Sequence, residues 1–448
     1  MRADQPRPLC FVLIPCGINL DTGGLVVDFD AIYREMIAPS IRAAGLEPVR
    51  ADEEFSGGII PKPIFERLVL CDYAIADVTT ANANIFYELG VRHAMRPHTT
   101  VLLYAEGRRP PFDLTSFQAL GYRLDAGGKP AVSELRGKLV ALLEAARGAS
   151  PDSPVYQLLD GIHAPEIAHA KTDIFREQVH YCESIKERLA VARKEGPDAV
   201  AAVESGLGEI ADQEAGVVVD LLLSYRAVKS WRRMISLAEK MPLPLRNTAM
   251  VQEQQGLALN RAGRGEEAER VLLQVLDKHG ASSETYTLLG RVYKDRWEAA
   301  LHDGSQALAA AELEKAIDAY VRGFETDWRD AFPGVNAVTL MELRQPPDPR
   351  REELLPVVRY AVERKIASGK SDYWDYATRV ELAVLAKDRG RAERALPDAL
   401  AAIREKWEPE TTARNLRLIR EARAARGEDP MSIDWIDQIE RELSNGAK

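Results

Sequence analysis

One stretch of the chain decides the fold around it: DYAIADVTTANANIFYELGVRHA, residues 72–94. Its first seven residues form a short apolar run that ends near Asp77, as a buried strand does. Hydroxyl and amide side chains of the kind that cap helices follow, and a helix is predicted to begin near Asn84. Strand, polar turn and helix in this order indicate an α/β fold with a parallel sheet.

The predicted helix has one carboxylate in its first two turns, Glu88. Ile85, Leu89 and Arg92 fall on one stripe at spacings of four and three, and Glu88 lies on a neighbouring face. The helix starts close to the carboxyl end of the preceding strand. Because ligands of open α/β sheets usually bind at that edge, Glu88 is the first candidate for chemistry.

The same alternation of apolar and amphipathic runs extends over residues 1–148 and predicts parallel strands with crossover helices. Strands are predicted at 10–14, 47–49, 73–78, 100–104 and 119–124. Helices are predicted at 29–45, 62–71, 84–95 and 131–147. Pro39 must kink or divide the first of these helices. The predicted fold class is α/β, a flavodoxin-like three-layer sandwich with a parallel sheet.

Several loop residues are expected at the carboxyl ends of these strands. Cys16 and Gly17 follow the first strand, Arg50 ends the second, and Ser56 and Gly57 come soon after it. All could converge on the pocket near Glu88. The Ser-Gly-Gly run offers backbone N–H groups to a phosphate or is simply a turn. Arg50 would bind a phosphate through two hydrogen bonds, or pair with Asp52.

Composition sets the frame for these predictions. With 448 residues, two or three domains are expected, and the net charge of -10 argues against a general nucleic-acid or anionic-membrane surface. The four cysteines lack CxxC spacing, so neither a zinc site nor a disulfide framework is indicated. The first apolar run is too short for a secretion signal, and no run reaches membrane-spanning length. A soluble cytoplasmic protein is expected.

From about residue 155 the strand signals disappear and the pattern becomes helical. Gly256 and Gly290 are 34 residues apart, the tetratricopeptide period, and bulky and small residues follow each at matching positions. Residues 297–310 look like an insertion before the second helix of the second repeat. We therefore predict a helical linker at 149–212 and an all-α tetratricopeptide-like solenoid at 213–448.

Such arrays present a surface that binds peptides or other domains, so a protein partner or activator is expected there. The alternative is that the repeats only dimerise or brace the first domain.

Three segments carry a resemblance to a known superfamily: FVLIPCG at 11–17, DFDAIYREMIAPSIRAAGLEPVRADEEFSGGII at 28–60 and CDYAIADVTTANANIFYELGVRHA at 71–94. They resemble the nucleoside 2-deoxyribosyltransferase-like superfamily, whose flavodoxin-like core is shared with TIR domains. In the transferases a helix glutamate attacks the anomeric carbon of a nucleoside, and in TIR-type NAD hydrolases it engages the ribose that bears nicotinamide. Glu88 matches that glutamate. The transferases have a second carboxylate six residues earlier, where this chain has Asn82.

The missing carboxylate favours NAD over ordinary nucleosides. Cleavage of an N-glycosidic bond passes through an oxocarbenium-like state that one carboxylate can stabilise. Nicotinamide is a good leaving group and needs no general acid, whereas other bases must be protonated or activated. Asp77, Asn82, Asn84 and Arg50 would then line the pocket, although Asn82 or Asn84 could instead cap the helix. Arg92 would bind a phosphate or pair with Glu88.

The whole two-part build resembles the central regulatory region of the apoptosis signal-regulating kinases, often labelled a TRAF-binding region. It also resembles bacterial proteins that are thought to make nucleotide signals in anti-phage defence. The leading hypothesis is an NAD glycohydrolase or ADP-ribosyl cyclase in prokaryotic immunity, with NAD as substrate, no other cofactor, and the repeats as regulators. The resemblance to TIR-like sites also implies a homo-oligomer. The alternatives are a non-catalytic nucleotide-binding or protein-interaction scaffold and a nucleoside 2-deoxyribosyltransferase.

Overall fold

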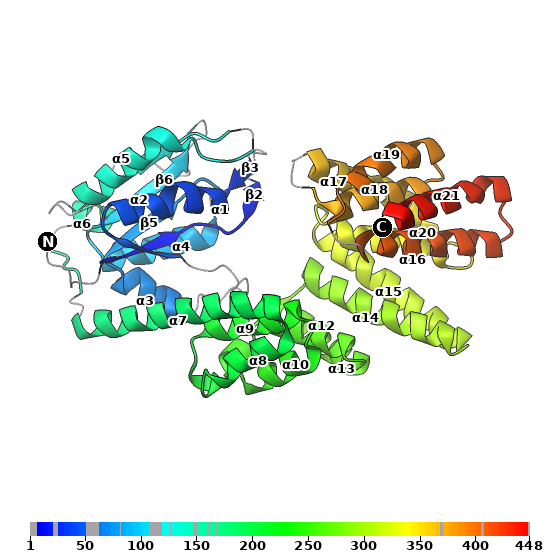
Figure 1. The fold of residues 1–448 in the computed structure, drawn as a ribbon, viewed down its shortest axis with the longest axis horizontal. Coiled ribbons are helices and arrows are strands. Elements are labelled where there is room, and N and C mark those ends of the chain that lie inside the picture. The colour runs from blue at the N-terminus through cyan, green and yellow to red at the C-terminus, as the bar shows by residue number, and fades with distance from the viewer. Residues whose placement is uncertain are drawn as a thin grey trace. The chain divides into compact units, whose positions relative to one another are not determined.

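The chain divides into two compact units, residues 1–229 and 230–448, which are described separately below. A computed structural model describes residues 7–20, 26–50, 62–80, 82–106, 119–125, 127–146, 151–159, 161–165, 169–367, 371–404 and 407–446. The first unit contains the sheet, and the second is built from helices (Figure 1).

The first unit is organised around a five-stranded parallel sheet in the order β4-β1-β5-β6-β7. Its strands are β1 (Leu9–Leu13), β4 (Glu47–Arg50), β5 (Tyr73–Asp77), β6 (Thr100–Ala105) and β7 (Ala119–Tyr122). Counted along the chain, the five strands are ordered 2-1-3-4-5, which is the flavodoxin order. The predicted fold class and all five predicted strands are confirmed.

Helices cover both faces of the sheet, which gives three layers (Figure 1). One face packs against α1 (Phe29–Ile32), the π-helical turn η1 (Tyr33–Ile37), α2 (Ala38–Ala43) and α5 (Val132–Ala145). The other packs against α3 (Lys62–Leu70) and α4 (Ala83–Met95). Alternate residues of β1 enter the two cores, Val12 on one side and Phe11 on the other.

Pro39 interrupts the first helix as the sequence predicts. The predicted helix at 29–45 is divided into α1, η1 and α2, and Pro39 is the second residue of α2. Proline has no N–H, so the carbonyl of Glu35, four residues earlier, lacks its usual helical donor. The Arg136 guanidinium of α5 donates to that carbonyl from Nε at 2.8 Å and from Nη2 at 2.5 Å. The neighbouring helix therefore satisfies the acceptor that proline leaves open.

A short antiparallel hairpin, β2 (Ile18–Leu20) and β3 (Val26–Asp28), was not expected from the sequence. Its strands are too short to give a pattern of alternating apolar residues. Gly128 holds it in place, because a Cβ at this position would lie 2.6 Å from the Val26 carbonyl oxygen. The Gly128 carbonyl also accepts a hydrogen bond from the Asp28 N–H at 2.9 Å.

The region predicted as a linker at 149–212 belongs to the first compact unit, as does α9 beyond it. It contains α6 (Pro154–Leu158), α7 (His169–Glu195), α8 (Pro197–Ser205) and the turn η2 (Ile210–Asp212), followed by α9 (Ala215–Ala227). Val179 of α7 joins the core beneath α3 and α4. Arg67 of α3 also pairs with Glu214 at 3.2 Å. These contacts tie the helices to the sheet domain.

The second unit is a succession of helix pairs. It begins with α10 (Trp231–Lys240) and α11 (Leu243–Arg246). The pairs are α12 (Ala249–Arg261) with α13 (Gly265–His279), α14 (Ser283–His302) with α15 (Gln306–Thr326), α16 (Ala331–Leu343) with α17 (Arg350–Ala367), α18 (Tyr373–Leu385) with α19 (Arg389–Ala401), and α20 (Trp407–Ala425) with α21 (Pro430–Gly446). The two helices of each pair pack on each other, as in an all-α solenoid.

Glycines at the repeat positions let the two helices of a pair approach closely. A Cβ on Gly256 would lie 2.8 Å from the Leu272 side chain, and one on Gly290 would lie 2.8 Å from the Tyr320 ring. The predicted 34-residue spacing therefore marks equivalent packing positions. The apparent insertion at 297–310 lengthens both α14 and α15 around the turn between them.

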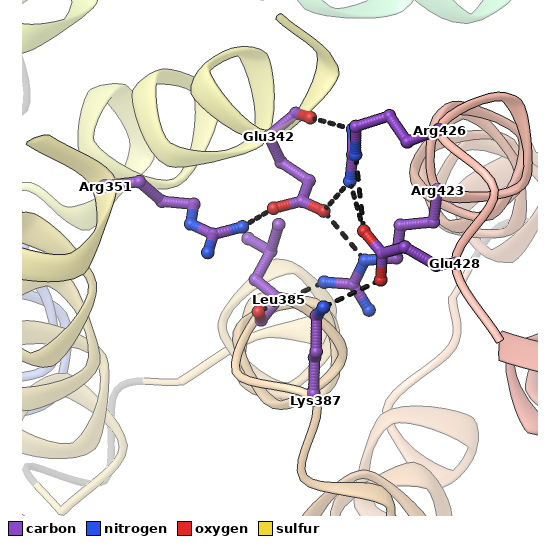
Figure 2. A network of polar contacts seen from close by, with 7 residues as sticks. All are labelled: Glu342, Arg351, Leu385, Lys387, Arg423, Arg426 and Glu428. Carbon is purple, nitrogen blue, oxygen red and sulfur yellow. Dashed lines mark hydrogen bonds and ion pairs between the residues drawn. The ribbon is translucent and has the colours of Figure 1, made fainter. Parts of the chain in front are cut away.

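A buried ion-pair network joins helices of different pairs (Figure 2). Its centre is the fully buried Glu342, the one charged residue of α16. Arg423 Nε and Arg426 Nη2 each lie 2.7 Å from Glu342 Oε1, and Arg351 of α17 pairs with Oε2. Arg423 also donates to the Leu385 carbonyl at 3.1 Å. The network ties α16, α17, α18 and α20 together.

Candidate functional site

The candidate catalytic residue, Glu88, lies in the second turn of α4, just beyond the carboxyl end of β5. Asn82 caps the helix, because its side-chain oxygen accepts from Asn84 N–H at 2.9 Å and from Ile85 N–H at 3.3 Å. Asn84 itself is exposed. Glu88, on the face next to the Ile85 stripe, is only 8% exposed. The start of α4 therefore holds a largely buried carboxylate beside amide groups.

Asp77 lies at the end of β5 in a buried hydrogen-bond network. The Tyr122 hydroxyl donates to its Oδ2 at 2.7 Å, and the Thr79 N–H donates to its Oδ1 at 3.0 Å. Thr79 Oγ1 is 3.0 Å from the Tyr122 hydroxyl and accepts from the Ala105 N–H at 2.9 Å. Burial raises the pKa of Asp77 to about 6, against the opposing effect of these hydrogen bonds. The network fixes the ends of β5, β6 and β7.

Gly17 and Arg50 meet near the ends of β1 and β4 on the carboxylate of Asp30, which is not among the predicted site residues. Asp30 Oδ1 accepts from Arg50 Nη2 at 2.7 Å and from the Gly17 N–H at 3.1 Å. Burial raises the pKa of Asp30, but the Arg50 and Gly17 hydrogen bonds outweigh it and the net pKa is lowered. The signal for Asp30 was its place in the first turn of a helix after a strand.

The Arg50 guanidinium has further contacts. It donates to the Pro15 carbonyl at 3.1 Å and stacks over the Tyr33 ring at 5.0 Å from the ring centre. Cys16 lies beside this cluster, and its carbonyl accepts from the Asn19 amide at 2.9 Å. The structure thus brings Cys16, Gly17 and Arg50 together. Ser56, Gly57 and Asp52 lie outside the described residues.

Arg92, a predicted phosphate contact, hydrogen-bonds backbone carbonyls before β5. Its side chain is fully buried, and its Nη1 donates to the carbonyls of Leu68 and Cys71, each at 2.8 Å. Its Nη2 donates to the Asp72 carbonyl at 3.1 Å. Burial lowers the pKa of Arg92 to about 10, which leaves it charged at neutral pH. The guanidinium therefore supplies hydrogen-bond donors to the backbone carbonyls between α3 and β5.

The candidate functional groups at this edge are carboxylates and amides. Burial and the charge of Arg92 lower the pKa of His93 to about 4, so this imidazole is neutral at neutral pH. Within the described ranges, no group of three or more His, Cys, Asp or Glu side chains is placed to hold a metal ion. Nor does that part of the chain contain a helix that is long and apolar enough to cross a membrane.

Comparison with protein families gives one match over most of the chain. The profile described as "MAP3K TRAFs-binding domain" matches residues 85–436. The match therefore includes most of α4, with Glu88, and nearly all of the helical second unit.

Three curated relatives are mitogen-activated protein kinase kinase kinases. The mouse kinase 15 is 28% identical over 216 residues, which is 45% of this chain and 16% of that protein. The nsy-1 kinase of Caenorhabditis elegans is 28% identical over 222 residues, 44% of this chain and 14% of the kinase. The human kinase 6 is 26% identical over 304 residues, 60% of this chain and 22% of the kinase. The aligned regions are thus a small part of each relative.

Solved structures give only distant matches. A tetratricopeptide repeat protein from Parabacteroides merdae has a TM-score of 0.33 and 11% identity, over 61% of this chain and 98% of the other. The human IFIT1 dimer with PPP-AAAA has a TM-score of 0.31 and 12% identity, over 60% of this chain and 64% of the other. The TPR2AB-domain:pHSP90 complex of yeast Sti1 has a TM-score of 0.19 and 11% identity, over 60% of this chain and 98% of the other.

Proposed function

This chain belongs to the MAP3K TRAFs-binding domain family, and we propose that it acts as a protein-interaction scaffold whose helical array holds a protein partner. The family match over residues 85–436 is the observation that carries this proposal. The array adds support, because three large side chains near α15, α16 and α17 are more than half exposed: Trp328 at 52%, Phe332 at 51% and Tyr360 at 68%. Aromatic residues of this kind are enriched in protein interfaces.

The partner class in the family's description is a TRAF protein, so the test uses purified TRAF proteins. The full chain and each TRAF protein are mixed, and complex formation is measured by sedimentation. We expect a complex that Trp328→Ala with Tyr360→Ala weakens by about tenfold or more. Met431→Ala is the matched control, because Met431 is an exposed apolar residue on α21 and should leave the affinity unchanged. Failure of every TRAF protein to bind would contradict the proposal.

A second candidate function is cleavage of the N-glycosidic bond of NAD at Glu88, as a glycohydrolase or ADP-ribosyl cyclase that the repeats regulate. The observation that favours it is the largely buried Glu88 carboxylate in a polar helix start at the carboxyl edge of a flavodoxin-like sheet. A buried carboxylate next to the anomeric carbon would stabilise the oxocarbenium-like state, and nicotinamide needs no general acid to leave. The product would serve as a nucleotide signal in prokaryotic immunity.

The test incubates the full chain with NAD and identifies linear and cyclic products by mass spectrometry. We expect turnover that Glu88→Gln abolishes, while Glu144→Gln, an exposed glutamate on α5, leaves it intact. Turnover per chain should rise with protein concentration if the site needs two chains. Turnover that survives in Glu88→Gln, or none in any condition that also contains the protein partner, would overturn this function.

Base exchange between nucleosides is the remaining alternative, and Asn82 decides it. The Asn82 side chain caps α4 as a hydrogen-bond acceptor, and aspartate caps a helix equally well. Asn82→Asp therefore restores the carboxylate of the transferases without loss of the cap. A gain in deoxyribosyl transfer in this variant would favour base exchange, and unchanged activity would count against it.

A further inference from the structure

The first helices of the later pairs form one face of the array. Thr339 of α16 donates to Glu381 of α18 at 2.5 Å, and the Asn415 amide of α20 donates to the same carboxylate at 3.3 Å. Arg414 of α20 pairs with Glu298 of α14 at 2.7 Å. Side chains of four first helices, α14, α16, α18 and α20, therefore meet at one place. In repeat arrays a surface shared by successive repeats is where partners bind.

Charged side chains gather at this place, and we call them the inner charge cluster. Its cations come from α12, α14 and α20, and its anions come from α14 and α18. The cations are Arg261, Arg291, Lys294 and Arg414, and the anions are Asp295, Glu298 and Glu381.

The three anions of the cluster are already bound by neighbouring groups. Asp295 is 2.9 Å from Arg291 Nε and accepts from the Asn260 amide at 2.7 Å. Glu298 pairs with Arg414, and Glu381 accepts from Thr339 and Asn415. Two of the four cations, Arg291 and Arg414, are engaged in these pairs.

The other two cations, Arg261 and Lys294, have neither a hydrogen bond nor an ion pair with any described residue. Lys294 is half-buried, and the charged groups facing it are Arg291 and Arg414 on the cationic side and Glu381 and Glu298 on the anionic side. Burial and the two arginines lower its pKa, which the two glutamates oppose. Burial and Arg291 also lower the pKa of Arg261.

A half-buried ammonium without a protein acceptor gives up part of its hydration and gains no protein hydrogen bond in return. An added carboxylate would supply that hydrogen bond, and a charge-assisted one is among the stronger kinds. Arg261 and Lys294 each lie close enough to Arg291 to feel its charge, so a ligand with two or more spaced carboxylates could reach both.

We propose that the inner charge cluster is where the array binds an acidic segment of its protein partner, with carboxylates against Lys294 and Arg261. This inference rests on the proposed scaffold function and adds to it the partner's chemistry and the residues that hold it. Affinity for such a segment should fall as salt is added, because exposed charges such as Arg261 are screened.

The test measures fluorescence anisotropy of a labelled decaglutamate peptide with the full chain, and a decaglutamine peptide serves as the uncharged control. We expect only decaglutamate to bind, and Lys294→Met to weaken it about tenfold. Lys278→Met is the matched control, because Lys278 is an exposed lysine on α13, the second helix of its pair, and should leave the affinity unchanged. Equal affinity of Lys294→Met and the parent chain would overturn the proposal, as would no binding of decaglutamate at low salt.

Thermal unfolding separates a binding role from a structural one. Because Lys294 is half-buried without an acceptor, Lys294→Met should melt at the same temperature as the parent chain or above it. A clear fall in melting temperature would assign Lys294 to the fold and overturn the proposal. A TRAF protein that binds Lys294→Met as tightly as the parent chain would also overturn it, while the scaffold function would stand. If no TRAF protein binds but decaglutamate binding depends on Lys294, the proposed scaffold function is contradicted, whereas the proposed site for acidic segments is supported.

Discussion

Individual side chains at the carboxyl edge of the sheet serve the fold as well as the candidate chemistry. Asp77 fixes three strand ends, Asn82 caps α4, and Arg50 anchors the Asp30 carboxylate near Gly17. Each of these residues was a predicted ligand contact. Their partners within the protein hold them in defined positions, and defined positions are what a binding site requires.

The raised pKa of Asp77 predicts a pH dependence of stability. The folded protein holds the Asp77 proton up to about pH 6, whereas the unfolded chain releases it near 3.8. The stabilising effect is therefore fully present below pH 3.8 and is lost as the pH rises to about 6, by about 3 kcal/mol in total. Asp77→Asn removes this effect, because an amide does not titrate. The free energy of unfolding of Asp77→Asn minus that of the parent chain should thus increase from pH 4 to 6.

Urea unfolding at a series of pH values checks this prediction. Asp152 also has a pKa raised to about 6 by burial, so only the difference between variant and parent isolates Asp77. Asp152→Asn, measured over the same pH range, should show its own pH-dependent difference in free energy of unfolding from the parent chain. A difference between Asp77→Asn and the parent chain that is constant with pH would contradict the assignment.

Residue types alone predicted which positions are polar and near the edge, but not what each contacts. The stripe of Ile85, Leu89 and Arg92 was predicted from helical spacing, and all three are buried. That spacing indicates a face and cannot indicate that the Arg92 guanidinium meets carbonyls from α3 and the loop before β5. Asp30 was missed because its partner, Arg50, is distant in sequence and meets it only through the order of the strands.

Among the elements, the repeat glycines support a test of packing. A Cβ on Gly290 would lie 2.8 Å from the Tyr320 ring, which is rigid and buried, so Gly290→Ala should destabilise the second unit by about 1–3 kcal/mol. Gly137 lies inside α5 with open space where its Cβ would be. Gly137→Ala should therefore stabilise the first unit by about 0.5–1 kcal/mol, the difference in helix propensity. Chemical denaturation gives both values, and a stable Gly290→Ala would contradict the close packing.

The ion-pair network of Figure 2 predicts a large loss of stability when an amide replaces its central carboxylate. Glu342→Gln leaves Arg423, which is fully buried, without its charged partner, and Arg351 also loses its own. Arg426 keeps its pair with Glu428 at 2.9 Å. Loss of one partner in a buried pair costs about 3–5 kcal/mol. Glu393→Gln removes an exposed pair with Arg389 and should change stability by less than about 0.5 kcal/mol. Equal denaturation midpoints for the two variants would show that the network contributes little.

The sequence predicted the positions of strands and of the helix break well, and the detailed form of local irregularities less well. Strand runs such as 73–78 and the break at Pro39 follow from short-range physics, and both appear where expected. The form of the break, a π-helical turn capped by Arg136, depends on a helix about a hundred residues later. Likewise, the apparent insertion at 297–310 adds turns to α14 and α15, because helix-forming residues continue the helices that they enter.

For the molecule as a whole, each unit has its own hydrophobic core. The described core clusters of the first unit are formed by residues between Leu9 and Val179, and the described cluster of the second by residues between Phe324 and Leu443. The sequence predicts a repeat domain at 213–448, and the chain divides into its two compact units between residues 229 and 230. Amphipathic helices look alike whichever core they join, so sequence pattern could not assign α9 to the first unit.

Separate cores predict that residues 1–229 and 230–448 fold independently. Each fragment, expressed alone, should give a cooperative thermal transition in circular dichroism, because each is a compact unit. The functions should divide in the same way. Any NAD cleavage that depends on Glu88 should remain with residues 1–229, and binding of decaglutamate should remain with residues 230–448 at the affinity of the full chain. A fragment without a cooperative transition would mean that its core needs the other unit, and loss of decaglutamate binding from a folded 230–448 fragment would mean that the first unit contributes to the acidic site.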